Sequence, residues 1–171
     1  MVRIRPLQKG EEWFLEQMLY EAMYISIYDR PLPESVVNLP ELALYIANFG
    51  RKGDLCYVSE ENGELIGAIW SRLWSKEQKG YGYVDEQTPE VSLALKPAFR
   101  GKGIGTKFIE VIGQVLQQQG YAQISLSVDR RNRAIELYRK QGFEITAATE
   151  GAFTMVKGLQ KNIFINTYHL V

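Results

Sequence analysis

The sequence is poor in the residues that mark disulfide-bonded, metal-binding and nucleic-acid-binding proteins. Its one cysteine, Cys56, excludes an intramolecular disulfide, and its one histidine, His169, has no evident partner for a metal site or a catalytic triad. Lys+Arg and Asp+Glu both number 20, so no basic excess favours a nucleic acid. No apolar run approaches the ~20 residues that span a bilayer, and the first residues lack the apolar segment of a signal peptide. We therefore expect a cytoplasmic protein with no metal, nucleic-acid or membrane partner.

The length and composition that remain predict one domain. The chain has 171 residues, of which 46% are hydrophobic and 23% charged, an ordinary composition for a globular domain. We assign residues 1–171 to a single domain with a C-terminal extension, 159–171. In this extension Ile163, Ile165 and Thr167 occupy alternate positions, which fits either an extra edge strand or a tail that packs on the domain.

Periodicity and turn residues predict the fold class α/β (α+β): a single mixed, largely antiparallel sheet with helices on both faces. The pair Asn62-Gly63 between two strand-like segments is a strong hairpin signal. The polar segment 75–89 carries Gly80 and Gly82 and is expected to be a mobile loop. The expected strands are 2–5, 54–60, 65–74, 91–96, 121–128, 143–147 and 153–157, and the expected helices are 11–24, 41–49, 104–119 and 132–141.

A glycine-rich run follows the strand-like segment 91–96 and opens the helix-like segment 104–119. Glycines let a backbone turn tightly and approach a ligand closely, and the first N–H groups of a helix have no intrahelical partner and favour anions. The run therefore predicts a pyrophosphate cradle, although a glycine-rich loop that only caps a helix is the alternative. Its spacing fits neither the P-loop nor the dinucleotide-binding fingerprint. The residues of the run are Arg100, Gly101, Lys102, Gly103, Ile104, Gly105 and Thr106.

A second segment completes a family pattern. Together the two segments resemble the GNAT N-acetyltransferase superfamily, whose glycine signature [QR]-x-x-G-x-[GA] is matched by Arg100, Gly103 and Gly105. The family's later stretch, N-x-A-hydrophobic-x-L-Y-x-x-x-G-F, is matched by Asn132, Ala134, Ile135, Leu137, Tyr138, Gly142 and Phe143. The resemblance covers about residues 54–159 and implies an acyl-CoA N-acyltransferase-like fold.

The resemblance implies that acetyl-CoA donates an acetyl group to an amine. It places the pantetheine arm along the backbone of Leu93 and Leu95, whose side chains could equally be core residues, and the pyrophosphate on the run 100–106. Asn132 is either the N-cap of its helix or a contact to the pantetheine arm. Tyr138 either protonates the departing CoA thiolate or simply packs on the sheet.

The remaining parts of the reaction are less well defined by the sequence. Glu90 is the candidate general base, and the alternative is a solvated carboxylate at the start of a strand. The acceptor is expected to be a small-molecule or peptide amine, bound by the first two helices and the loops 31–40 and 75–89. Their aromatic residues, which include Trp13, Tyr20, Tyr24 and Tyr28, could equally be core residues. Two other readings stay open: a non-catalytic module that senses acyl-CoA, and an acyltransferase of the same fold with another donor or an O-acceptor. A homodimer is also expected.

Overall fold

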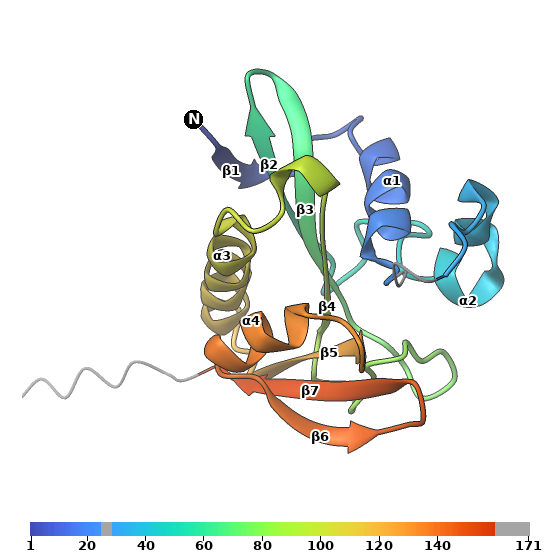
Figure 1. Ribbon diagram of the computed structural model, residues 1–171. Coiled ribbons are helices and arrows are strands. Elements are labelled where there is room, and N and C mark those ends of the chain that lie inside the picture. The colour runs from blue at the N-terminus through green and yellow to red at the C-terminus, as the bar shows by residue number, and fades with distance from the viewer. Residues whose placement is uncertain (25–28, 160–171) are drawn as a thin grey trace, which may run out of the picture.

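One twisted sheet organises the computed structural model, which describes residues 1–24 and 29–159. In these residues the sheet has seven strands in the order β1-β2-β3-β4-β5-β7-β6, and Figure 1 shows helices on both sides of it. The elements are β1 (Arg3–Pro6), α1 (Trp13–Ala22), the 3-10 helix η1 (Glu34–Asn38), α2 (Pro40–Ala43), β2 (Leu55–Glu61), β3 (Glu64–Arg72), β4 (Glu90–Leu95), the 3-10 helix η2 (Pro97–Phe99), α3 (Ile104–Gln118), β5 (Gln123–Asp129), α4 (Ala134–Lys140), β6 (Glu144–Ala148) and β7 (Ala152–Gly158).

The predicted mixed, largely antiparallel sheet is confirmed. Every neighbouring pair of strands is antiparallel except β4 and β5, which are parallel. The hairpin between β2 and β3 turns at Asn62 and Gly63, whose φ angles of 53° and 81° are the left-handed conformations that a tight hairpin turn requires. Gly142, with φ 87°, ends α4 in the same way.

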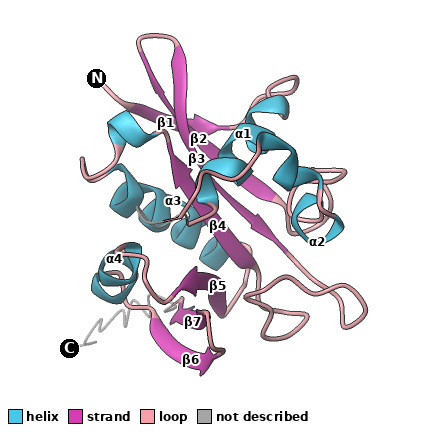
Figure 2. Ribbon diagram, turned by 45° about the vertical axis from the view of Figure 1, so that its right-hand side comes forward, coloured by secondary structure: helices cyan, strands magenta, loops and turns pink. Residues whose placement is uncertain are grey.

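Two apolar clusters cover the two faces of the sheet, and Figure 2 shows the helices that lie over these faces. On one face α3 buries Phe108, Ile109, Ile112 and Leu116, one stripe of its helical surface, and Ile135 of α4 joins the same cluster. On the other face α1 buries its own stripe, which consists of Phe14, Leu15, Met18 and Leu19. The sheet core therefore separates the α3 and α4 side from the α1 and α2 side.

The second predicted helix is shorter than expected. α2 ends at Ala43 instead of continuing to residue 49. The buried guanidinium of Arg72 donates to the carbonyls of Leu44 and Ala47, and it forms an ion pair of 2.7 Å with Asp54. Carbonyls that bond to a side chain no longer need helical partners, so Arg72 holds this segment as turns against β3.

Some residues discussed in the sequence analysis lie within the described structure and others lie outside it. Cys56 is buried in β2. Among the described residues, no helix is long and apolar enough to cross a membrane. Tyr28, His169 and the alternating positions from Ile163 lie outside the described residues.

Candidate functional site

The sheet opens between β4 and β5. Within residues 1–24 and 29–159, these parallel strands pair in register only at Glu90 and Ser125, where the Ser125 N–H donates to the carbonyl of Pro89 at 3.0 Å. Beyond that pair β5 runs across the lower end of β4 instead of alongside it (Figure 1). The carboxyl-terminal half of β4 thus has backbone groups without a neighbouring strand on that side.

The backbone groups that face this gap belong to Leu93 and Leu95. The Lys96 N–H donates to the carbonyl of Ile66 in β3 at 2.9 Å. Hydrogen-bonding direction alternates along an antiparallel strand, so Leu93 and Leu95 direct their N–H and C=O groups away from β3. The side chain of Leu95 is buried in the apolar cluster beneath α3 and α4, and the side chain of Leu93 packs against the same cluster. The two interpretations of these residues are therefore compatible, because the core uses their side chains and the gap exposes their backbones.

The glycine-rich run forms the turn between η2 and α3, beside the gap. Gly101 and Gly103 have φ angles of 73° and 79°, and a Cβ at either position would meet no atom within 4 Å. Backbone conformation rather than crowding therefore requires glycine at both positions. α3 begins at Ile104 without a side-chain cap, so the N–H groups of its first turn are available to an anion. Gly105 serves packing, since a Cβ there would lie 3.0 Å from Leu137 of α4.

The two cations of the run are placed differently. Arg100 Nε donates to the carbonyl of Leu95 at 3.0 Å, and Arg100 Nη2 lies 2.7 Å from a carboxylate oxygen of Glu21 in α1. Lys102 is exposed, with its Nζ 5.1 Å from the ring centroid of Phe99. Arg100 is thus a link between β4 and α1, although 52% of its side chain is exposed, and Lys102 is a second exposed cation of the run.

Asn132 and Tyr138 are placed by α4. The Asn132 Oδ1 accepts a hydrogen bond of 2.9 Å from the N–H of Ala134, the first residue of α4, although the N-cap position itself is occupied by Arg133. The Tyr138 ring packs edge-on against Phe143 with centroids 5.7 Å apart, and its side chain is half-buried. Desolvation by the groups packed around it raises the pKa of Tyr138 to about 12. The phenol is protonated at neutral pH, as any tyrosine with an ordinary or raised pKa is.

Glu90 is buried, with 3% of its surface exposed, so the alternative of a solvated carboxylate is wrong. Tyr45 donates its hydroxyl to Glu90 Oε1 at 2.8 Å, and the Trp74 indole N–H donates to Oε2 at 2.7 Å. Burial raises the pKa of Glu90 to about 7, although hydrogen bonds from Tyr45, the Gly82 backbone and Trp74 act in the opposite direction. A carboxylate with this pKa can both take and release a proton near neutral pH.

The loop 75–89, expected to be mobile, closes over this carboxylate. A Cβ at Gly80 would lie 2.2 Å from Glu90 Oε2, and a Cβ at Gly82 would lie 2.7 Å from the backbone of Leu126. The glycines thus allow close approach rather than flexibility. Tyr45, which the sequence reasoning did not single out, also bonds this loop by accepting the Tyr81 N–H at 2.7 Å.

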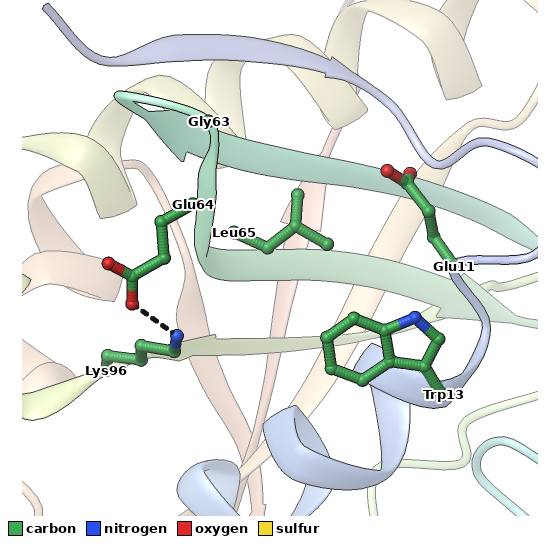
Figure 3. Close-up of a pocket in the computed structure, with 6 residues that line it drawn as sticks. All are labelled: Glu11, Trp13, Gly63, Glu64, Leu65 and Lys96. Atoms are coloured by element: carbon green, nitrogen blue, oxygen red, sulfur yellow. Dashed lines mark hydrogen bonds and ion pairs between the residues drawn. The ribbon is translucent and has the colours of Figure 1, made fainter.

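Two surface pockets lie elsewhere, on either side of the exposed Trp13. One of about 380 Å³ is lined by Glu11, Trp13, Gly63, Glu64, Leu65 and Lys96. Figure 3 shows the Trp13 ring and the Glu64–Lys96 ion pair on opposite sides of it. The other, of about 370 Å³, lies along α1 and η1. Trp13 and Tyr20, aromatic residues of the segments in which the acceptor is expected, line the second pocket, whereas no residue predicted to bind the donor or to move a proton lines either pocket.

Comparisons with known proteins agree with this geometry. Residues 9–143 match the acetyltransferase (GNAT) family. A mycothiol acetyltransferase of Streptomyces coelicolor is 31% identical over 88 residues, 51% of this chain and 26% of that protein. A thialysine N-epsilon-acetyltransferase of Bos taurus is 38% identical over 58 residues, 33% of this chain and 34% of that protein. The chain thus spans 26% to 34% of the length of these relatives.

Solved structures share the fold over nearly the whole chain. The acetyltransferase YncA of Salmonella typhimurium with acetyl-CoA has a TM-score of 0.67 at 24% identity, covering 94% of this chain and 95% of that one. The ribosomal-protein-S18-alanine N-acetyltransferase of Escherichia coli has a TM-score of 0.66 at 19% identity, covering 99% and 100%.

Proposed function

Because this chain belongs to the acetyltransferase (GNAT) family, we propose that it transfers the acetyl group of acetyl-CoA to an amine of an acceptor by direct attack. The observation that carries the proposal is the gap between β4 and β5, which opens beyond Glu90 and Ser125 and ends at the uncapped start of α3. The gap offers backbone N–H and C=O groups of β4 to the amides of the pantetheine arm. The start of α3 offers N–H groups that bind anions to the diphosphate.

Residues of β4 and of the run 100–106 would hold the donor. The backbone of Leu93 and the N–H of Leu95 face the gap and can bond the amides of the pantetheine arm as an added strand would. The N–H groups from Gly103 to Thr106 would receive the pyrophosphate, with Lys102 as an exposed cation. This direction carries the arm from the carboxyl end of β4 toward Glu90. Asn132, whose Oδ1 accepts the Ala134 N–H, would present its amide nitrogen to the same arm.

Two side chains would move the protons. The bound donor supplies a thioester, an acyl group activated for attack by a neutral amine. Glu90 would take the proton that an ammonium must lose before its nitrogen can attack, and its pKa of about 7 fits that task. As the C–N bond forms and the C–S bond breaks, Tyr138 would donate its phenolic proton to the departing sulfur. The phenolate would then recover a proton from the acceptor nitrogen, which loses its second proton as the amide forms. The acceptor would belong to the class of small-molecule or peptide amines, the small-molecule side being favoured by relatives named for thialysine and S-(2-succino)cysteine.

The experiment is a test of CoA release. The protein is incubated with acetyl-CoA and a panel of polyamines, amino acids, aminoglycosides and peptide N-termini, and free thiol is measured. We expect release with at least one amine and acetylation of that amine by mass spectrometry. A thermal unfolding series accompanies it, in which acetyl-CoA at a hundred times its Kd stabilises by about 2.7 kcal/mol, a Tm rise of roughly 5–10 °C.

The same experiment separates the competing readings. Stabilisation by acetyl-CoA without thiol release from any amine would contradict the enzyme and favour an acyl-CoA-sensing module. Stabilisation by a longer acyl-CoA alone would identify another donor. The expected homodimer and cytoplasmic location, and the single domain over 1–171, remain predictions for sedimentation, cell fractionation and limited proteolysis.

A further inference from the structure

The Glu90 carboxylate accepts hydrogen bonds from neutral groups in three parts of the fold. Tyr45 comes from the turns after α2, Trp74 follows β3, and Gly82 lies in the loop 75–89. Ser125 lies opposite on β5. Tyr45 is the titratable group in direct contact with the carboxylate, and Tyr81 lies beyond it. In the part of the chain that the structure describes, the groups that hydrogen-bond to Glu90 are therefore dipoles. The buried cation of Arg72, which is the register partner of Glu90 on β3, is instead paired with Asp54.

Tyr45 is itself held from several sides. Its hydroxyl donates to Glu90 and accepts the Tyr81 N–H at 2.7 Å. Its ring meets Trp74 edge-on with centroids 5.0 Å apart and stacks on Tyr81 at 6.4 Å. With 7% of its surface exposed, the side chain is nearly enclosed. A hydroxyl held in this way cannot swing to another acceptor, so it fixes the direction of the carboxylate oxygen that it bonds.

Trp74 fixes the other oxygen. Its indole N–H can only donate, and it lies 2.7 Å from Glu90 Oε2. A Cβ at Gly80 would lie 2.6 Å from this indole nitrogen and 2.2 Å from Glu90 Oε2, so the loop leaves no space for the pair to move apart. An ionised carboxylate has about four acceptor sites. The two side chains and the Gly82 N–H use three of them, which leaves one.

We propose that Tyr45 and Trp74 are positioning residues for Glu90, each holding one carboxylate oxygen so that the remaining acceptor site points to the acetyl-transfer gap. This inference rests on the proposed function. Neutral donors suit such a base because a cation in their place would stabilise the ionised form strongly and weaken its affinity for a proton. They fix the orientation of the carboxylate while leaving it able to take the proton of the acceptor.

The test compares Tyr45→Phe and Trp74→Phe with the matched control Tyr81→Phe, which keeps the stacked ring and the backbone N–H donor. The dependence of kcat/KM on pH is measured with the most active amine of the panel. Loss of a donor to the ionised carboxylate raises its pKa, so the ascending limb should move up by about one pH unit in both test variants. We expect kcat to fall about tenfold, the KM for acetyl-CoA to stay unchanged, and Tyr81→Phe to superimpose on the wild type.

A readout without turnover separates this proposal from the acetyl-transfer proposal. The Glu90 carboxyl carbon is titrated by ¹³C NMR in wild type and Tyr45→Phe, with Glu90→Gln as the assignment control. A higher pKa of Glu90 in Tyr45→Phe than in the wild type supports the positioning of Glu90 by Tyr45. This result would stand even if no amine is acetylated and the proposed function fails. An unchanged pKa of Glu90 would overturn the positioning role even in an active acetyltransferase. A lower Tm with an unchanged pH dependence of kcat/KM in the test variants would overturn it as well.

Discussion

The guanidinium of Arg100 lies 2.7 Å from the carboxylate of Glu21, an ion pair that joins the glycine-rich run to α1 across 79 residues of sequence. The same side chain bonds the carbonyl of Leu95 at the end of β4. Arg100 therefore fixes the position at which the chain leaves the sheet and enters the run. Its charge is already compensated by Glu21, so we expect its role in donor binding to be indirect.

Glu21→Gln should weaken acetyl-CoA binding modestly, by about two- to fivefold, the range of a partly exposed ion pair. Arg100→Ala should weaken it further, and the double variant should equal Arg100→Ala alone because both changes remove one interaction. Isothermal titration calorimetry with acetyl-CoA measures this, with Glu16→Gln as an exposed control on the same helix. Tighter binding in Glu21→Gln would show instead that Arg100 is a phosphate ligand restrained by Glu21.

Tyr138→Phe tests the proton donor. The ring stays edge-on to Phe143 in this variant, so the free energy of unfolding and the Kd for acetyl-CoA should be unchanged. We expect kcat to fall about 100-fold because the departing thiolate loses its proton source. Steady-state kinetics and calorimetry measure the two quantities, and Tyr121→Phe, a half-buried tyrosine of the same cluster, is the control. An unchanged kcat would assign Tyr138 to packing alone.

The sequence predicted the parts of this fold that depend on local chemistry. Asn62 and Gly63 take the φ angles that their hairpin requires, and Gly142 ends α4 in the left-handed region, since these conformations follow from the residues themselves. The start of α3 at Ile104 follows in the same way from the glycines before it.

The sequence could not show which distant side chains meet. Glu90 bonds Tyr45, 45 residues earlier, and a strand-start carboxylate has no pattern that distinguishes such burial from exposure. The two glycines of the loop 75–89 were read as a sign of mobility, whereas both allow close contact with Glu90, Trp74 and Leu126. Periodicity reports the face on which a residue lies, but tertiary packing decides what lies against it.

Gly82→Ala should damage the site through the loop. Its Cβ would lie 2.7 Å from the Leu126 backbone and 2.9 Å from Glu90 Cδ, and a strand backbone cannot move aside as a flexible side chain can. We expect a loss of about 1–3 kcal/mol in the free energy of unfolding together with reduced kcat. Urea unfolding measures the first quantity. Gly151→Ala, whose Cβ would meet no atom within 4 Å, should leave both unchanged.

Stability and activity should respond to pH in opposite directions through Glu90. Burial raises its pKa from 4.5 to about 7, so the folded protein binds this proton more tightly than the unfolded chain does. The contribution of Glu90 to the free energy of unfolding is therefore complete below pH 4.5 and is lost as the pH rises to 7. Above pH 7 the free energy of unfolding no longer changes through this group. The loss should be on the order of 3 kcal/mol.

The pH dependence of activity has the opposite sign, because a general base must be ionised to accept a proton. The value of kcat/KM should therefore rise as the pH increases through 7. The comparison is urea unfolding of wild type and Glu90→Gln at several pH values from 5 to 8. Glu11 and Asp129, whose pKa values are lowered by Arg5 and Arg131, lose their stabilising effect only as pH falls, and both proteins share them. The difference between the two proteins thus isolates Glu90. If that difference does not change with pH, the carboxylate is ionised throughout and a proton acceptor near neutral pH must be sought elsewhere.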